Sequence, residues 1–433
     1  QMSGIGWYGD LGNFLVMPAT GPLQTAAGSQ QHPEEGSRSA YSKQTEKASA
    51  GYYAVTLTEH NIKAEMTAAP HSGIMRFTFP ANQRSRIQID LARRVGGTST
   101  WQEVKVINDS TIAGYMQCTP EGGGWGNGDG KGNYTVYFYA QFSKPLSKYG
   151  VWSADIPDGW SRKREDVESA RYQQRIAQAK VLPGAKEKAG KHLGFYTEFA
   201  TAKEEAVLMK AGISFVSIAG AKANLETEIK DWNFNGVQQR AFDSWNKALG
   251  KMTITGGSAA EKKIFYTALY HTMIDPRNFS DADGKYIGGD GKVHAVKNFS
   301  KRTIFSGWDV FRSQMPLQTI INPRVVNDMI NSLVTLADET GNHYLERWEF
   351  LNAYSGCMIG NPAVSVMADA WAKGIRGFDI NKGYAYAKNS VEKFGNGSKG
   401  CSTGGLSVSL TLEYACSDWC LGKLAGALGK KED

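Results

Sequence analysis

The sequence predicts a multidomain β + α protein, in which an N-terminal antiparallel β-sandwich is followed by a helical domain. Two observations support this prediction. A chain of 433 residues is long for one domain. Its apolar residues also recur every second position before residue 225 and at spacings near 3.6 after it. We expect a sandwich domain over residues 1–225, a helical linker over 226–257 and a helical domain over 258–433.

Alternating apolar and polar residues, rich in aromatic and β-branched side chains, mark the strands of the first half. Strands are expected at residues 52–57, 74–79, 86–91, 134–142 and 213–219. Gly, Pro and Asn separate these runs, which is typical of an antiparallel sandwich. Residues 162–180 are the exception, because they are charged and favour a helix, and they predict a surface insertion.

The second half predicts a succession of helices with short links, as in an all-α domain built from hairpins. Helices are expected at residues 259–274, 310–321, 323–338, 362–373, 383–393, 406–415 and 418–428. Pro323 and Pro362 stand at the starts of two of them, where the first helical turn tolerates proline.

Composition argues against several classes of protein. The net charge of +7 is mild and the Lys and Arg residues are scattered, so there is no electrostatic sign of nucleic-acid binding. No apolar run approaches the roughly 18–20 residues that span a membrane. Five Cys residues, an odd number without metal-binding spacing, argue against a disulfide scaffold.

The sequence SGWDVFR at residues 306–312 is a candidate sugar site. The ring of Trp308 can face pyranose C–H groups, while Asp309 and Arg312 supply a planar acceptor and a planar donor for vicinal hydroxyls. An ion pair between Asp309 and Arg312 is expected. The alternative is a helix start with a buried Trp and a surface ion pair, since short motifs often match by chance.

Two further segments are candidates for substrate binding. Trp348 and Glu349 are predicted to line the cavity of the helical domain, with an amphipathic surface helix as the alternative. The Gly-rich sequence EGGGWGNGDG at 121–130 includes Gly124 and Trp125. It lacks the following helix of a phosphate-binding loop, so it is either a flexible hairpin loop or a loop that presents Trp125 and backbone groups to a sugar.

Several stretches, in their order and rough spacing, resemble glycoside hydrolase family 92, the calcium-dependent, inverting, exo-acting alpha-mannosidases. They are GNFLVMPATG at 12–21, GYYAVTL at 51–57, FYTALYHT at 265–272, FSDADGKY at 279–286, SGWDVFR at 306–312, CMIGNPA at 357–363, ADAWAKGI at 368–375, LEYA at 412–415 and AGALGK at 425–430. The resemblance runs from near residue 5 to the end, and the ordered set is more specific than any one motif.

The resemblance implies an (α/α)6 toroid behind the sandwich, with residues 258–433 as its first half. Family members are much longer. Their general acid lies in a Glu-Gly-Asn-type stretch beyond the segment that ends this chain, and their base aspartates lie later still. We therefore expect the catalytic acid and base beyond residue 433. The chain resembles an internal fragment with a truncated sandwich, which alone would be inactive.

As implied function, we expect exo-acting, inverting removal of non-reducing mannose from N-glycans or mannan, with alpha-1,2 linkages preferred. Calcium would hold the mannose 2- and 3-hydroxyls, with its ligands mostly outside the fragment. Asp309 would bind sugar rather than act as acid or base, and the family pattern favours Gly124 and Trp125 as a sugar-facing loop. A secreted, periplasmic or cell-surface protein is expected. The alternative is a non-catalytic carbohydrate-binding protein with a sandwich and a helical dock.

Overall fold

The computed structural model describes residues 12–28, 35–94, 97–119, 133–157 and 167–430. Among these residues the chain divides into two compact units between Gly250 and Lys251. The division falls inside the segment 226–257 that the sequence predicts as a helical linker.

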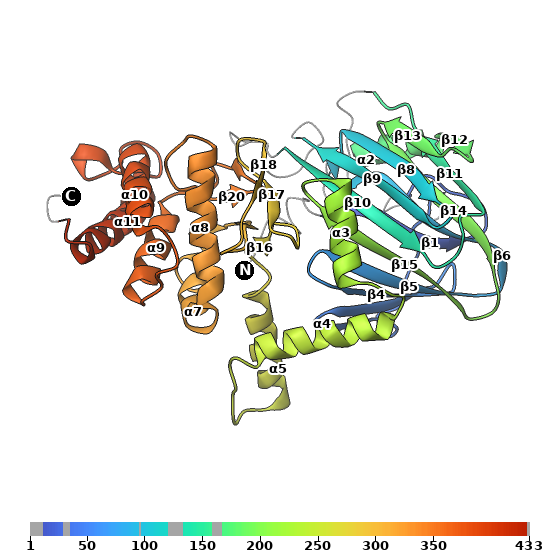
Figure 1. Ribbon diagram of the computed structural model, residues 1–433, viewed down its shortest axis with the longest axis horizontal. Coiled ribbons are helices and arrows are strands. Elements are labelled where there is room, and N and C mark those ends of the chain that lie inside the picture. The colour runs from blue at the N-terminus through green and yellow to red at the C-terminus, as the bar shows by residue number, and fades with distance from the viewer. Residues whose placement is uncertain (1–11, 29–34, 95–96, 120–132, 158–166, 431–433) are drawn as a thin grey trace. The chain divides into compact units, whose positions relative to one another are not determined.

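The first unit contains two antiparallel sheets (Figure 1). The smaller sheet has the order β1 (Asn13–Thr20), β6 (Asn82–Arg94), β14 (Leu193–Thr201), β11 (Lys148–Ser153) and β12 (Lys180–Pro183), with β7 (Gly97–Thr98) beside β6. The larger has the order β13 (Glu187–Gly190), β8 (Trp101–Asn108), β9 (Thr111–Cys118), β10 (Tyr134–Phe142), β15 (Glu205–Ser214), β5 (Ser72–Phe79), β4 (Ile62–Ala68), β3 (Tyr52–Leu57) and β2 (Lys47–Ser49). The predicted antiparallel sandwich is confirmed.

The two sheets bury one continuous apolar core. Ile89 of β6 and Phe195 of β14 pack there with Phe77, Ile112 and Val207 of the larger sheet. Each of these side chains is at most 2% exposed, so strands of both sheets contribute side chains to the core.

Helix α3 (Ile218–Glu228) covers the outer face of the larger sheet (Figure 1). The sequence predicted a strand over 213–219, and this is wrong, because β15 ends at Ser214. The Ser214 hydroxyl accepts hydrogen bonds from the backbone N–H groups of Val216 and Ser217, and Ser217 then caps α3 at Gly220. Such local side-chain bonds stop a strand and start a helix.

Two more helices belong to this unit. Helix α4 (Phe234–Leu249) packs against the sheet through Phe234 and Val237. Helix α2 (Val167–Ala177) lies in the segment predicted as a surface insertion. Its Tyr172 and Ile176 are buried, so this helix is part of a small apolar cluster and not only a surface feature.

The second unit is mainly helical, which confirms the predicted helical domain. Its helices are α5 (Ala259–His271), α6 (Gly307–Val310), α7 (Gln314–Ile321), α8 (Pro323–Glu339), α9 (Pro362–Ala372), α10 (Ile380–Phe394) and α11 (Ser407–Ala427), with the short 3-10 helix η3 (Gly397–Lys399). Short strand pairs join them: β16 (Arg277–Asn278) with β19 (Arg302–Thr303), β17 (Lys285–Ile287) with β18 (Val293–Ala295), and β20 (Glu349–Phe350) with β21 (Ala353–Tyr354).

Several helix boundaries differ from the sequence prediction: α5 ends at His271 instead of 274, and α10 begins at Ile380 instead of 383. The helix expected over 310–321 begins only at Gln314, as α7, because Ser313, with φ of −146°, leaves helical backbone, and Val310 ends the separate short helix α6. The two helices expected over 406–415 and 418–428 form the single helix α11. The two residues between them, Cys416 and Ser417, are neither Gly nor Pro, so the helix continues through them.

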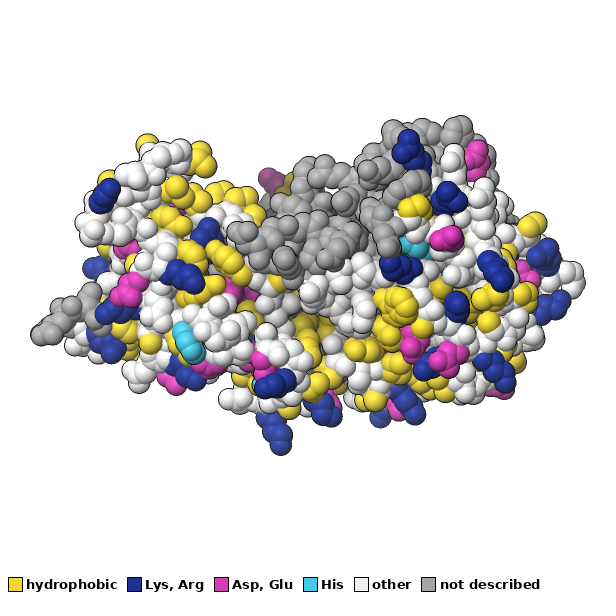
Figure 2. All heavy atoms as spheres, turned by 90° about the horizontal axis from the view of Figure 1, so that it is seen from above, with side chains coloured by type: hydrophobic (Ala, Val, Ile, Leu, Met, Phe, Trp, Pro, Cys, Tyr) yellow, Lys and Arg dark blue, Asp and Glu magenta, His cyan; other side chains and the backbone are white. Residues whose placement is uncertain are grey.

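Apolar residues remain exposed on and just before α11. They are Leu406, Val408, Leu412 and Trp419, which are 64–76% exposed. On the face shown in Figure 2, apolar side chains are grouped between scattered Lys and Arg side chains. Exposed apolar groups of this kind often mark contact surfaces.

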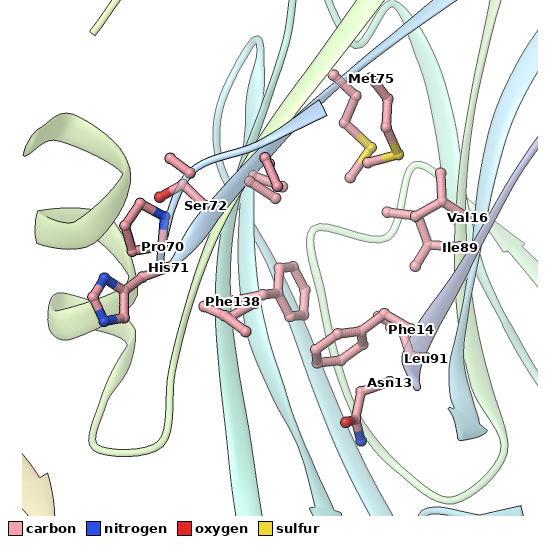
Figure 3. A pocket seen from close by; sticks show the side chains of 17 residues that line it. Asn13, Phe14, Val16, Pro70, His71, Ser72, Met75, Ile89, Leu91 and Phe138 are labelled. Carbon is pink, nitrogen blue, oxygen red and sulfur yellow. The ribbon is translucent and has the colours of Figure 1, made fainter. Parts of the chain in front are cut away.

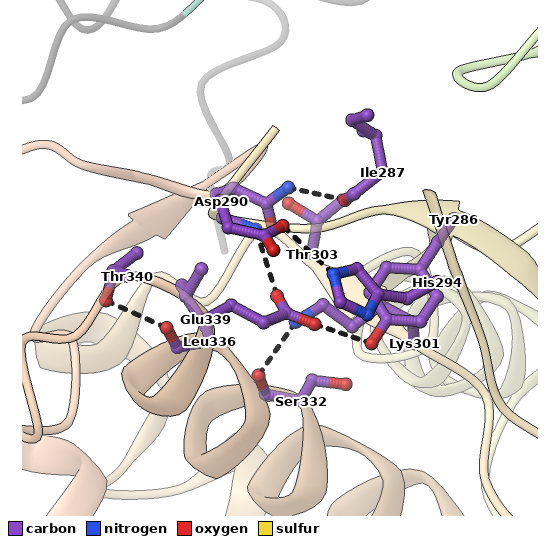
Figure 4. Close-up of polar contacts among 12 residues, drawn as sticks. Tyr286, Ile287, Asp290, His294, Lys301, Thr303, Ser332, Leu336, Glu339 and Thr340 are labelled. Carbon is purple, nitrogen blue, oxygen red and sulfur yellow. Dashed lines mark hydrogen bonds and ion pairs between the residues drawn. The ribbon is translucent and has the colours of Figure 1, made fainter. Parts of the chain in front are cut away.

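A buried polar cluster fastens the β17–β18 hairpin to α8 (Figure 4). Lys301 is fully buried, which lowers the pKa of its amine. Its Nζ donates to the Ser332 carbonyl at 3.0 Å and lies 3.7 Å from Glu339 Oε2. The Tyr286 hydroxyl donates to Glu339 Oε1 at 2.6 Å, and the Gly289 N–H donates to Oε2 at 2.9 Å. These contacts reduce the desolvation cost of burying the Lys301 amine and the Glu339 carboxylate.

A second buried acid lies in the segment that leads into β20. Glu346 is 2% exposed, and its Oε2 atom has no hydrogen-bond partner among the described residues. Burial, and then the neighbouring Glu349 carboxylate, raise the pKa of Glu346 to about 8, although Lys393 and Arg347 act in the opposite direction. Glu346 is therefore largely a neutral acid at pH 7.

We expect Glu346→Gln to flatten the dependence of stability on pH between about 4.5 and 8. In this window the unfolded chain has lost a proton that the folded protein keeps. The free energy of unfolding therefore falls as the pH rises, by up to about 1.4 kcal/mol per pH unit. Stability at each pH is measured by urea denaturation. Glu392→Gln, at an exposed position of α10, is the matched control, and a Glu346→Gln slope equal to the parent's would contradict the prediction.

Candidate sugar-binding site

Backbone hydrogen bonds to a neighbouring segment fix the start of α6, the short helix that carries Trp308 and Asp309. Phe305 and Glu349 exchange backbone hydrogen bonds of 3.0 and 3.2 Å. A side chain at Gly307 would place its Cβ 2.2 Å from the Arg347 carbonyl oxygen, so only glycine fits there. The structure thus brings the segments around residues 305–309 and 347–349 together.

Asp309 is half-buried at the end of this pinned turn. The Ser306 hydroxyl donates to its Oδ2 atom at 2.5 Å, and no described residue donates to Oδ1. The thiol of Cys357 is nearby, and its pKa is raised by burial and by the Asp309 carboxylate. A half-buried carboxylate with one open oxygen is suited to accept hydrogen bonds from sugar hydroxyls.

Arg312 does not pair with Asp309, which corrects the sequence expectation. Its guanidinium bends back over the Trp308 ring, 4.5 Å from the ring centroid, and donates twice to the Trp308 carbonyl, at 3.0 and 3.2 Å. Its acidic partner is Glu413 of α11, at 3.5 Å. The indole N–H of Trp308 donates to the same Glu413 oxygen at 3.1 Å.

Trp348 and Glu349 lie behind the site in the hydrophobic interior. They are 3% and 2% exposed, and β20 begins at Glu349, so the alternative of a surface helix is wrong. The Glu349 carboxylate accepts hydrogen bonds from the Thr303 hydroxyl at 2.8 Å, the Ile304 N–H at 2.9 Å and the Asn352 N–H at 2.8 Å. These contacts favour a structural role, and substrate binding by this pair stays a prediction. Burial raises the pKa of Glu349.

Gly124 and Trp125 lie outside the described residues, so their role as a sugar-facing loop stays a prediction. Sequence reasoning gave no role to Ser306, Cys357 or Glu413. The spacing of Ser306, three residues before Asp309, was a usable local signal. No signal in the sequence showed that Glu413 reaches a residue more than a hundred positions away.

An apolar cavity of about 350 Å³ lies between the sheets of the first unit (Figure 3). Phe14 and Leu91 of the smaller sheet and Phe138 of the larger are among its lining residues. Asn13, His71 and Ser72 are the polar side chains that line it. A sugar needs a hydrogen-bond partner for most of its hydroxyls, so this cavity fits a sugar poorly.

Across the described residues, no group of three or more His, Cys, Asp or Glu side chains is arranged to hold a metal ion. Calcium prefers six to eight oxygen ligands, which can include backbone carbonyls and water as well as carboxylates. Within the same residues, no helix has both the length and the apolar character needed to cross a lipid bilayer.

Two family models match the chain. The glycosyl hydrolase family 92 N-terminal domain matches residues 1–214, and the glycosyl hydrolase family 92 catalytic domain matches residues 220–433. A curated relative from Arthroderma benhamiae, described as an uncharacterized secreted glycosidase, is 22% identical over 399 residues, which are 89% of this chain and 47% of that protein.

Solved structures agree with this match. The family GH92 alpha-mannosidase BT3965 from Bacteroides thetaiotaomicron is 33% identical with a TM-score of 0.84, over 98% of this chain and 55% of that one. The family GH92 inverting mannosidase BT2199 from the same organism shares the fold, at 24% identity and a TM-score of 0.79, over 97% and 53% of the two chains. The chain spans about half the length of these relatives. The sandwich, the helical unit and both family models lead to one conclusion: the chain belongs to glycosyl hydrolase family 92.

Proposed function

We propose that this chain is part of an exo-acting, inverting alpha-mannosidase that removes non-reducing mannose from N-glycans or mannan, with alpha-1,2 linkages preferred. The observation that carries the proposal is the 33% identity to a family GH92 alpha-mannosidase over 98% of the chain. That mannosidase has also been solved in complex with mannoimidazole. The half-buried Asp309 carboxylate, with one oxygen open, supplies a group suited to mannose hydroxyls.

In this proposal the described residues bind and orient the sugar. Asp309 accepts hydrogen bonds from mannose hydroxyls and Trp308 forms a wall beside them. An inverting reaction also needs an acid for the leaving oxygen and a base for water, with their carboxyl groups roughly 6.5–9.5 Å apart. Glu349 does not suit either task, because internal donors already occupy its carboxylate. We assign the acid and the base to residues outside this chain.

Calcium dependence and export from the cytoplasm are parts of the same proposal. The calcium ligands would come mainly from outside this chain, consistent with the resemblance to family 92. The word "secreted" in the description of the Arthroderma benhamiae relative supports a secreted, periplasmic or cell-surface location. The competing proposal is a carbohydrate-binding protein without catalysis, and hydrolysis of a mannoside by a protein that carries this chain separates the two.

Asp309→Asn, in an active protein that carries this chain, should lower kcat/KM for an aryl alpha-mannoside by about 10- to 100-fold. A hydrogen bond to a charged acceptor contributes about 1.5–3 kcal/mol, and the substitution removes the charge while keeping the shape. Steady-state kinetics and a thermal melt are the measurements.

The matched control for this prediction is Asp369→Asn. This carboxylate is on α9, where it pairs with Lys373 at 2.8 Å, and its loss should leave kcat/KM near the parent value. The idea fails if Asp309→Asn keeps a normal kcat/KM and only lowers the melting temperature. The Asp309 carboxylate would then only stabilise the N-terminal end of a helix through its dipole, which contributes about 0.3–1 kcal/mol to the free energy of unfolding.

The 433-residue chain by itself should not hydrolyse aryl alpha-mannosides above background, with or without added calcium. The proposal places both the proton donor and the group that activates water outside it, and the reaction depends on that pair. Release of the aryl alcohol is followed by absorbance. Turnover that a single substitution within residues 1–433 abolishes would show that the catalytic pair is inside the chain.

A further inference from the structure

We propose that Glu413 is a positioning residue for the candidate sugar site, because it holds the Trp308 indole and Arg312 in one arrangement beside Asp309. The effect on catalysis rests on the proposed function. The contact itself does not, and it can be tested separately.

Helix α6 cannot fix its own side chains. It is a single turn of four residues, and its N-cap residue Ser306 makes no side-chain capping bond. A helix this short gains little from its own hydrogen bonds, so contacts with other elements must set the direction of Trp308. The indole N–H bond to Glu413 Oε1, at 3.1 Å, is such a contact, and it comes from α11.

Arg312 lies between the same Glu413 carboxylate oxygen and the face of the Trp308 ring. Its guanidinium lies 4.5 Å from the centroid of the Trp308 ring and 3.5 Å from Glu413 Oε1. The edge and one face of the indole are therefore held by two charged groups that also hold each other. We call Glu413 and Arg312 together the clamp. A pyranose can stack only on the opposite face of the indole, so the clamp determines which face of the Trp308 ring contacts the sugar.

Helix α11 is itself held in place near Glu413. The Ser417 hydroxyl accepts a hydrogen bond from the Asn361 N–H at 2.9 Å and donates to the Glu413 carbonyl at 3.2 Å. Gly360, at φ of +78°, lies so close that a Cβ there would be 3.5 Å from Glu413 Cβ. The turn that leads from Cys357 to α9 thus fixes the base of the Glu413 side chain. A clamp mounted on a fixed helix can hold a binding residue to the accuracy that a sugar site needs.

A double-mutant cycle with Trp308→Phe tests the positioning role in an active protein that carries this chain. Glu413→Leu removes the acceptor and should lower kcat/KM for an aryl alpha-mannoside about tenfold or more. Glu413→Gln keeps an acceptor oxygen and should lose only a few-fold, which is the rescue by the conservative variant. In the Trp308→Phe background, which lacks the indole N–H, Glu413→Leu should add little. If the fold-loss in kcat/KM of the double variant equals the product of the two single-variant losses, the proposal is overturned, because Glu413 would then act independently of Trp308.

A spectroscopic readout of the same variants separates this proposal from the proposed function. In protein labelled with fluorotryptophan, the Trp308 resonance is identified by its loss in Trp308→Phe. Glu413→Leu should shift that resonance, and the control Glu392→Leu, at an exposed site of α10, should not. An unmoved Trp308 resonance overturns the clamp. A shifted resonance with unchanged hydrolysis overturns its positioning role. A shifted resonance in a protein that neither hydrolyses mannosides nor binds mannoimidazole supports the contact and overturns the proposed function.

Discussion

One buried carboxylate sets the geometry around the candidate site. Glu349 has no access to water, so its charge must be balanced by hydrogen bonds from the protein. Thr303 and Ile304 supply two of these bonds from one segment and Asn352 supplies another from a second. The segment of β19 that leads into α6 and the β20–β21 hairpin are therefore joined through hydrogen bonds to the Glu349 carboxylate. The position of the turn that carries Asp309 depends on this junction.

Much of the fold follows from local patterns in the sequence. Alternation identified strands such as β3 and β10, and Pro323 and Pro362 marked the first residues of α8 and α9. The failures have local causes as well. The apolar run at 213–219 has the composition of a strand, but the Ser214 and Ser217 hydroxyls bind nearby backbone N–H groups and turn the chain into a helix.

The site was predictable only in part, and the distance between partners along the chain explains why. Residue types in one short segment pointed to Trp308 and Asp309 as a sugar-binding pair. The same reasoning gave Arg312 the wrong partner, because a neighbour at helical spacing was visible and Glu413 was not. Glu349 looked available for a ligand in the sequence, whereas in the structure its carboxylate is buried and accepts three hydrogen bonds from the protein.

Gly307 has a consequence for the interpretation of sequence variation. A Cβ atom there would fall 2.2 Å from the Arg347 carbonyl and 2.6 Å from Pro362, so every other amino acid is excluded by sterics alone. Substitutions at this position would be selected against on structural grounds, whether or not the protein that carries this chain is an enzyme. An invariant glycine here among related sequences would therefore carry no information about chemistry, whereas variation at the neighbouring position 309 would.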